Sequence, residues 1–211
     1  MRFHMRLTFS FALTAAAALM FAQPAFATKP LLDCEAGTVD QVLCENTELM
    51  ALHQRAITTI NRVITKAEEL KLTAPEKEQI VGDHSGWLAS RQNCLDVIDT
   101  TPKECLMQMY TTRVAELEAQ WWLVPPTHSP ETYTCGGETV KVTYFQTDHP
   151  VVTVEYEELR SVFKAVPAAS GRKYEGPFGQ YWWTKGSERM FLKDIDKDPL
   201  QCTGAEGNRP L

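Results

Sequence analysis

The sequence has no long apolar run after its first 27 residues, so no later segment predicts a transmembrane helix. It also lacks the His-Glu-x-x-His pattern of zinc hydrolases, the Gly-x-Ser-x-Gly turn of serine hydrolases and a glycine-rich phosphate loop. No pair of cysteines has the Cys-x-x-Cys spacing that is typical of redox and zinc sites. These absences lead us to expect no enzymatic activity, no catalytic residues, no metal and no cofactor.

Histidine and acidic side chains likewise form no recognisable ligand set. The histidines beyond the first 27 residues do not have metal-ligand spacing: His53, His84, His128 and His149. We interpret His53, on a predicted helix, and His149, in a predicted turn, as structural or solvated. Three alternating aspartates hint at calcium, but the glycine and the distal glutamate of an EF-hand loop are missing: Asp194, Asp196 and Asp198. A charged loop is the simpler interpretation.

The first 27 residues have the pattern of an export signal. Arg2 and Arg6 make a short basic start, and the apolar run Leu7–Phe21 is too short to span a bilayer as a stable helix. Ala25-Phe26-Ala27 supplies the small-x-small cleavage pattern. We therefore expect cleavage near Ala27, no membrane anchor, and a periplasmic or secreted protein.

The chain is acidic. It has 21 lysines and arginines against 27 aspartates and glutamates, a formal charge of −6, and loss of the signal would remove two of the positive charges. An acidic chain is a poor match for nucleic acid or an anionic membrane, so we expect neither as a partner. It suits a basic partner. Nothing in the sequence supports or excludes a homo-oligomer.

Residues 28–123 predict a helical domain, either a hairpin or a small bundle. Thr38 and Gln41 resemble a capping box for a short helix through Cys44. Apolar residues at helical spacing then predict a helix to about Leu70. The segment 73–76, with threonine, proline and glutamate, predicts the start of the next helix, and another begins near Pro102.

Residues 131–211 predict strands instead of helices. The segment 124–130 has three prolines and is expected to be an extended linker. After this linker, apolar residues recur at every second position in the segments 140–144 and 152–156. The segment 159–166 is rich in β-branched and aromatic residues. Short strands separated by glycine-containing turns favour a small antiparallel barrel or sandwich. The fold class is therefore α+β, with two domains.

Six cysteines follow the signal, an even number that predicts disulfides in an exported chain: Cys34, Cys44, Cys94, Cys105, Cys135 and Cys202. The last two lie where a disulfide would join the ends of a strand domain with a thin core. The pairing of the other four is open. Local pairs, Cys34 with Cys44 and Cys94 with Cys105, are favoured because each closes a short loop beside a helix end.

The strand domain resembles the MliC/PliC family of c-type lysozyme inhibitors over residues 133–203. Five features carry the resemblance through their order and spacing: Tyr133-x-Cys135, Val140-Lys-Val-Thr-Tyr144, Ser170-Gly-Arg-Lys-Tyr174, Trp182-Trp-Thr-Lys-Gly186 and a closing Cys202. The resemblance implies an antiparallel barrel with one disulfide. It also implies an inhibitor that blocks the catalytic cleft of a c-type lysozyme with a serine and a lysine on neighbouring loops.

The matching lysozyme-binding positions in this sequence are Ser170, Gly171, Arg172, Tyr174 and Lys185. The resemblance gives Ser170 and Lys185 the two contacts with the catalytic carboxyl groups, and Tyr174 offers a rigid aromatic anchor. Without the resemblance, Ser170 is a turn serine before glycine and Lys185 a solvated turn lysine. Tyr174, Trp182 and Trp183 then become wall or core aromatics, and adjacent strand residues such as the two tryptophans face opposite sides.

Residues 34–117 resemble the LprI-like module of exported bacterial proteins, whose biochemical role is poorly defined. The features are Cys34, Val42-Leu-Cys44, Leu49, Leu52, Trp87-Leu-x-x-Arg91-x-x-Cys94, Cys105-Leu106 and Tyr110. His84-Ser-Gly86 before Trp87 departs from the pattern and is expected to loosen the helix there. The alternative to an inhibitor is a non-catalytic adaptor of the cell envelope, with this helical module as its interaction domain.

Overall fold

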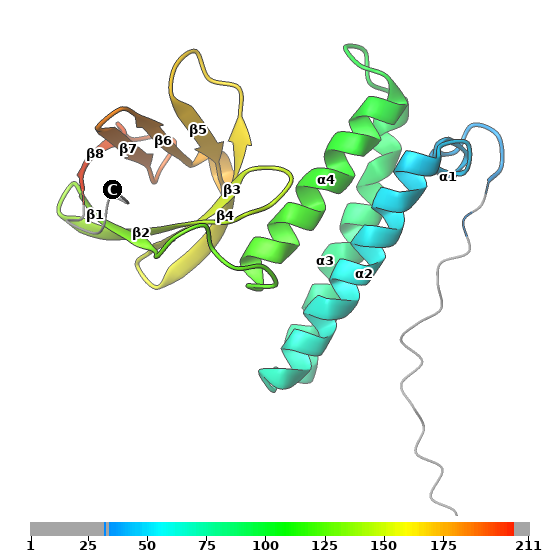
Figure 1. Cartoon of the computed structure of the whole chain (residues 1–211), viewed down its shortest axis with the longest axis horizontal. Coiled ribbons are helices and arrows are strands. Elements are labelled where there is room, and N and C mark those ends of the chain that lie inside the picture. The colour runs from blue at the N-terminus through cyan, green and yellow to red at the C-terminus, as the bar shows by residue number, and fades with distance from the viewer. Residues whose placement is uncertain (1–31, 33, 205–211) are drawn as a thin grey trace, which may run out of the picture. The chain divides into compact units, whose positions relative to one another are not determined.

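The computed structural model of the chain describes residues 32 and 34–204. The predicted export signal, residues 1–27, and its cleavage site lie outside the described residues. The elements come in two groups along the chain, helices first and strands second, which confirms the predicted α+β class (Figure 1).

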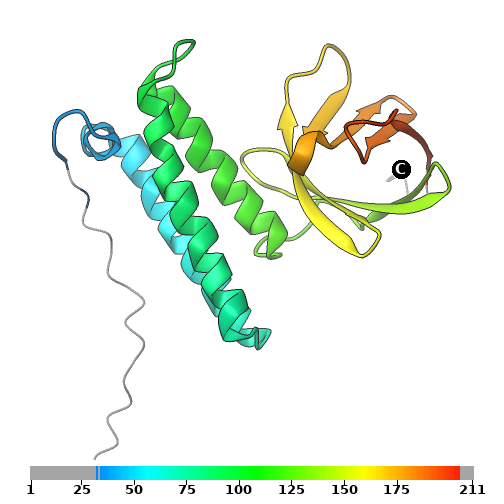
Figure 2. The ribbon, with the colours of Figure 1, turned by 180° about the vertical axis from the view of Figure 1, so that it is seen from behind.

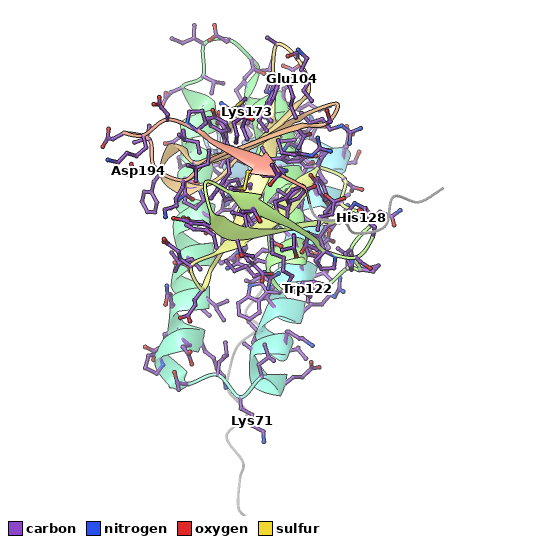
Figure 3. The ribbon with its side chains drawn as sticks, turned by 90° about the vertical axis from the view of Figure 1, so that its left-hand side faces the viewer. Lys71, Glu104, Trp122, His128, Lys173 and Asp194 are labelled. Atoms are coloured by element: carbon purple, nitrogen blue, oxygen red, sulfur yellow. A yellow bond between two sulfur atoms is a disulfide. The ribbon has the colours of Figure 1, made fainter. Side chains whose placement is uncertain are left out.

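The helical region contains α1 (Val39–Cys44), α2 (Thr47–Glu69), α3 (Ala74–Ser90), a 3-10 turn (Arg91–Leu95) and α4 (Pro102–Gln120). The helices α2, α3 and α4 run alongside one another in the views of Figures 1 and 2. A turn with Lys71 at its tip joins α2 to α3 (Figure 3), and Lys71 itself has a positive φ of 56°. The predicted starts are confirmed, because threonines stand at the N-cap positions of α1, α3 and α4.

The helical core lies between α1, α2 and α4. Leu49 and Ala56 of α2 pack with Leu106, Tyr110 and Val114 of α4, and all five are buried. The helix α3 contributes less, because none of its residues is fully buried. It also continues through His84-Ser-Gly86 without a break, where the sequence predicted loosening.

The strands form a closed antiparallel barrel in which each strand pairs with its neighbour in the chain and β8 returns to β1. Figures 1 and 2 show this arrangement. The strands are β1 (Glu131–Cys135), β2 (Glu138–Tyr144), β3 (Val151–Tyr156), β4 (Leu159–Val166), β5 (Arg172–Glu175), β6 (Tyr181–Lys185), β7 (Glu188–Leu192) and β8 (Leu200–Thr203). The architecture is a barrel, the first of the two forms that the strand pattern allowed.

The barrel interior follows the predicted alternation. Val140 and Val142 of β2 face Val152 and Val154 of β3, and all four are fully buried. Trp182 fills the centre and donates its indole N–H to the Tyr144 hydroxyl at 3.0 Å. Its neighbour Trp183 points the other way and is partly exposed, as expected for adjacent strand residues.

The three disulfides pair Cys34 with Cys44, Cys94 with Cys105, and Cys135 with Cys202. The two local pairs in the helical region are those that the short loops favoured. The third joins β1 to β8 at the seam where the barrel closes, and its two cysteines are direct partners in the strand register.

The helical region contacts the barrel through α4. Ala115 and Ala119 pack against Phe145 and Val151, which flank the loop between β2 and β3, and all four side chains are buried. Residues 124–130, predicted as an extended linker, run beside the end of β2. There the Thr127 amide donates to the Tyr144 carbonyl at 2.9 Å.

The seam disulfide is expected to stabilise the protein more than the disulfide beside α1. Cys135 and Cys202 are 67 residues apart, whereas Cys34 and Cys44 are 10 apart, and the lost chain entropy grows with loop length. Replacing Cys135 and Cys202 by alanine should lower the free energy of unfolding by about 4 kcal/mol, against about 3 kcal/mol for the other pair. Denaturant unfolding followed by tryptophan fluorescence measures both, and an equal or smaller effect at the seam contradicts the prediction.

Candidate functional site

A groove of about 730 Å³ lies at one end of the barrel. Its lining comes from the segment before β1, the β2–β3 loop, the start of β5 and the β6–β7 turn. Four of the five predicted lysozyme-binding residues line it, and Gly171, Arg172 and Lys185 are three of them. Tyr174 also lines it, and Ser170 immediately precedes Gly171 in the chain.

The structure brings the loops of Ser170 and Lys185 side by side. Arg172 pairs with Thr184 in the β5–β6 register, so Gly171 lies against the end of β6. A Cβ atom on Gly171 would stand 2.2 Å from the Thr184 carbonyl oxygen and 3.0 Å from the Lys185 Cβ. Ser170, Gly171 and Lys185 are all exposed. A hydroxyl and an ammonium are therefore presented to solvent from adjacent loops.

Trp183 fixes the backbone at Ser170. Its indole N–H donates to the Ser170 carbonyl oxygen at 2.9 Å. Because Trp183 lies in β6 on the outer side of the barrel, this bond ties the β4–β5 loop to the strand that ends in Lys185. The outward-facing tryptophan thus positions the loop, while the inward-facing Trp182 builds the core.

The rim of the groove is cationic. Arg172 and Lys185 are joined there by Arg189 of β7, which faces Thr184 across the β6–β7 hairpin. The Arg189 guanidinium donates to the Gly186 carbonyl at 2.6 Å, so it also braces the turn that follows Lys185. Sequence reasoning missed Arg189. The hairpin register around Lys185-Gly186 was the signal that could have found it.

One carboxylate, that of Glu131, lines the groove together with these cations. Glu131 accepts a hydrogen bond from the Tyr133 hydroxyl, and the His128 ring lies 3.9 Å from its other oxygen. Burial, followed by the hydrogen bond to Glu131, raises the pKa of Tyr133 to about 12. The tyrosine therefore remains a neutral hydroxyl donor at physiological pH, and the rim carries three cations against one carboxylate.

The floor of the groove is aromatic. Tyr174 is only 3 % exposed and packs in the barrel core, where its ring centroid lies 6.1 Å from that of Tyr144. Burial raises the pKa of Tyr144, whose hydroxyl accepts the indole N–H of Trp182. Tyr174 thus supports the floor from within, which agrees with the wall or core aromatic that the sequence allowed beside an aromatic anchor.

The residues that carry the LprI-like pattern meet in the core of the helical region. The ring centroids of Trp87 and Tyr110 lie 5.1 Å apart, edge to face. Arg91 donates to the Tyr110 hydroxyl at 2.6 Å, and His53 shares that hydroxyl through Nδ1 at 2.9 Å. The disulfide Cys94–Cys105 closes the same core. These side chains bind one another, which is the arrangement of a structural core.

His84 sits at the edge of this core among positive charges. Its ring stacks on Trp87 with centroids 5.6 Å apart, and the Arg113 guanidinium lies 5.9 Å from the centroid of the Trp87 ring. Within the described residues, His84 Nδ1 and Arg113 Nε have no hydrogen-bond partner. Burial, then Arg113, Arg91 and His53, lower the pKa of His84 to about 4.

This depressed pKa predicts a loss of stability in mild acid. Between the ordinary histidine pKa of about 6.5 and the folded value of about 4, the unfolded chain binds a proton that the folded chain does not. The free energy of unfolding should therefore fall as the pH drops through this window. The variant His84→Gln should show a shallower fall between pH 7 and 4.5, measured by denaturant titration at each pH. If the free energy of unfolding falls equally steeply with pH in the variant and in the unsubstituted chain, His84 is not the group that causes the fall.

Gly171 is expected to be required for the placement of the Ser170 loop. Its φ is +72° and a Cβ there meets the Thr184 carbonyl, whereas Gly186 has a φ of +55° with open space around its Cβ position. Both Gly171→Ala and Gly186→Ala carry the left-handed backbone penalty of about 1–3 kcal/mol. Only Gly171→Ala adds a backbone clash, so its loss in unfolding free energy should be the larger. Equal losses in denaturant unfolding would show that the close approach is unimportant.

Comparison with known families gives a match to the barrel of this chain. Residues 133–201 match the family described as membrane-bound lysozyme-inhibitor of c-type lysozyme, MliC. The matched segment spans most of the barrel and includes the loops of Ser170 and Lys185. It corresponds to the resemblance seen in the sequence. The model of that family does not extend over the helices, so the LprI-like resemblance there stays a prediction. No curated protein gives a significant match to the chain.

Proposed function

We propose that the barrel inhibits c-type lysozyme by inserting the Ser170 and Lys185 loops into the catalytic cleft. The observation that carries this proposal is the adjacency of the two exposed loops within the segment that matches the inhibitor family. The cationic rim around them supports it further, because a cleft with catalytic carboxyl groups is an anionic target.

The chemistry of the target fits the two side chains. Lysozyme is the type case of a retaining glycosidase, which works with one protonated and one ionised carboxyl group about 5–5.5 Å apart. The Ser170 hydroxyl can donate to the ionised form of a carboxyl group or accept from the protonated form. The Lys185 ammonium is a compact positive charge on a flexible stem, suited to the ionised partner. Together they can satisfy both groups while their loops exclude substrate.

The local charge of the rim is opposite to that of the whole chain. The chain carries a formal charge of −6, yet Arg172, Lys185 and Arg189 converge at the mouth of the groove. A basic lysozyme would be attracted over a long range by the acidic chain, and its anionic cleft would then meet the cationic rim at contact. The Gly171 turn and the Tyr174 floor hold this rim in place.

We also propose that the protein works outside the cytoplasm, where its target would be found. Three disulfides support an oxidising compartment. In the described part of the chain, no helix has the length and apolar character needed to cross a membrane. Cleavage near Ala27 remains part of this proposal.

Lys185 is expected to contribute most to inhibition. Removing one partner of a buried, hydrogen-bonded charge pair typically costs about 2–5 kcal/mol of binding free energy, at least about 30-fold in Kd. Lys185→Met keeps the apolar stem and should weaken inhibition by this amount, and Ser170→Ala should weaken it less, because a neutral hydrogen bond is lost. Inhibition of a c-type lysozyme acting on peptidoglycan, with Kd from surface plasmon resonance, measures both.

Lys197 provides the matched control. It is an exposed lysine in the β7–β8 loop, and its removal changes the net charge by the same amount as Lys185→Met. Lys197→Met should inhibit as well as the unsubstituted protein. If Lys185→Met also inhibits fully, the proposed mode of binding is wrong. If the unsubstituted protein inhibits no c-type lysozyme, the proposed function itself is wrong.

A further inference from the structure

We propose that the helical region positions one wall of the inhibitory groove, and that Arg55 and Asp148 form the tie that does so. The inference rests on the proposed function, since it concerns the same groove. It assigns Arg55 and Asp148 as positioning residues that act through the β2–β3 loop, residues 145–150. It also gives the helices a role in lysozyme binding without requiring them to touch the catalytic cleft.

The β2–β3 loop is shared between the groove and the helices. Phe145, Pro150 and Val151 line the groove. Phe145 and Val151 are only 5 % and 2 % exposed, because their side chains pack with Ala115 and Ala119 of α4. The same two residues thus face the proposed binding surface on one side and the helix on the other. Movement at the helix contact would therefore be transmitted to the groove.

The barrel alone holds this loop weakly. The ladder between β2 and β3 ends at the pair Tyr144 and Val152, so residues 146–150 lie outside it. The next backbone bond, from the Phe145 amide to the Val151 carbonyl, is long at 3.4 Å. On the β4 side, the Ala165 amide donates to the Pro150 carbonyl at 2.9 Å. The middle of the loop must be oriented by something other than strand pairing.

Arg55 supplies that orientation from α2. Its guanidinium donates to the Asp148 carboxylate in the loop and, through Nη2, to Glu118 Oε1 of α4 at 3.2 Å. The Glu118 side chain is 7 % exposed, whereas the Asp148 side chain is 63 % exposed. One end of the bridge is therefore anchored within the helical region, and the other holds an exposed loop that has few bonds of its own.

An aromatic contact also links the helical region to the β2–β3 loop. Trp122, the second residue after α4, packs edge to face on Phe145 with ring centroids 5.2 Å apart (Figure 3 labels Trp122). Arg160 of β4 lies over the Trp122 ring at 5.1 Å and donates to the Ala119 carbonyl at 2.9 Å. Phe145 is thus packed against the residues that follow α4. The Arg55 bridge holds the adjoining part of the loop at Asp148.

The test is Asp148→Ala in the full-length chain. This change removes the loop end of the bridge and leaves the buried Glu118 paired with Arg55, so the fold should survive. We expect faster hydrogen–deuterium exchange in peptides covering residues 145–151. We also expect the Kd for a c-type lysozyme to rise about 3- to 10-fold. The rise should come from faster dissociation, because an unrestrained wall must be ordered in each complex.

Three further variants separate positioning from charge. Asp196→Ala removes an equal charge from the β7–β8 loop and should change neither the exchange nor the dissociation rate. Asp148→Glu keeps the carboxylate and should retain most of the affinity. Arg55→Ala should reproduce the faster loop exchange of Asp148→Ala. A change confined to the association rate, and abolished by added salt, would mean that Asp148 acts by electrostatic attraction and would overturn the proposal.

Each remaining outcome also decides the question. Unchanged exchange over residues 145–151 in Asp148→Ala overturns the tie. Faster exchange with an unchanged dissociation rate overturns the link from the loop to binding. If the unsubstituted chain fails to bind lysozyme, the proposed function fails first, and the exchange measurement still tests whether Arg55 and Asp148 hold the loop.

Discussion

The close approach of Gly171 to the carbonyl of Thr184 is the constraint on which the candidate site depends. It brings the β4–β5 loop against the end of β6, so that a serine and a lysine from different hairpins stand next to each other. The Trp183 indole holds the loop through the Ser170 carbonyl, and Arg189 holds the turn after Lys185. The positions of the two loops are therefore set by contacts with backbone carbonyls rather than by the side chains of Ser170 and Lys185.

Charge in this protein is organised on two length scales. The whole chain is acidic, and many of its carboxylates are paired at the surface, as Glu138 and Glu157 are with Lys193. At the mouth of the groove the local sign reverses, because three cations from β5, β6 and β7 meet there. For the proposed lysozyme partner, long-range attraction and short-range recognition would thus be supplied by different parts of one molecule.

Local patterns predicted the elements well, because their causes are local. Threonine caps set the starts of α1 and α4, and the alternation of valines placed β2 and β3. The sequence could not show that Arg55 reaches Asp148, 93 residues away, since no periodicity encodes such a contact. It also left Tyr174 open between an aromatic anchor and a core aromatic, because the motif gives its neighbours but not which face of a four-residue strand points inward. Arg189 was missed because the Lys185-Gly186 turn was recognised, but the residue that its hairpin register places opposite Thr184 was not identified.

The seam between β1 and β8 has a consequence for the proposed export of the protein. Only two residue pairs, Thr134 with Thr203 and Cys135 with Cys202, are matched there, and one of them carries the disulfide. A newly synthesised chain in a reducing cytosol lacks that covalent link, and β1 and β8 then have exposed edges with unsatisfied amides and carbonyls. Such a precursor is easier to keep unfolded for translocation but prone to strand-to-strand aggregation. Under the proposed export, oxidation outside the cytoplasm would close the barrel covalently at Cys135 and Cys202. The chain would then no longer be easy to unfold, and its strand edges would no longer be open to aggregation.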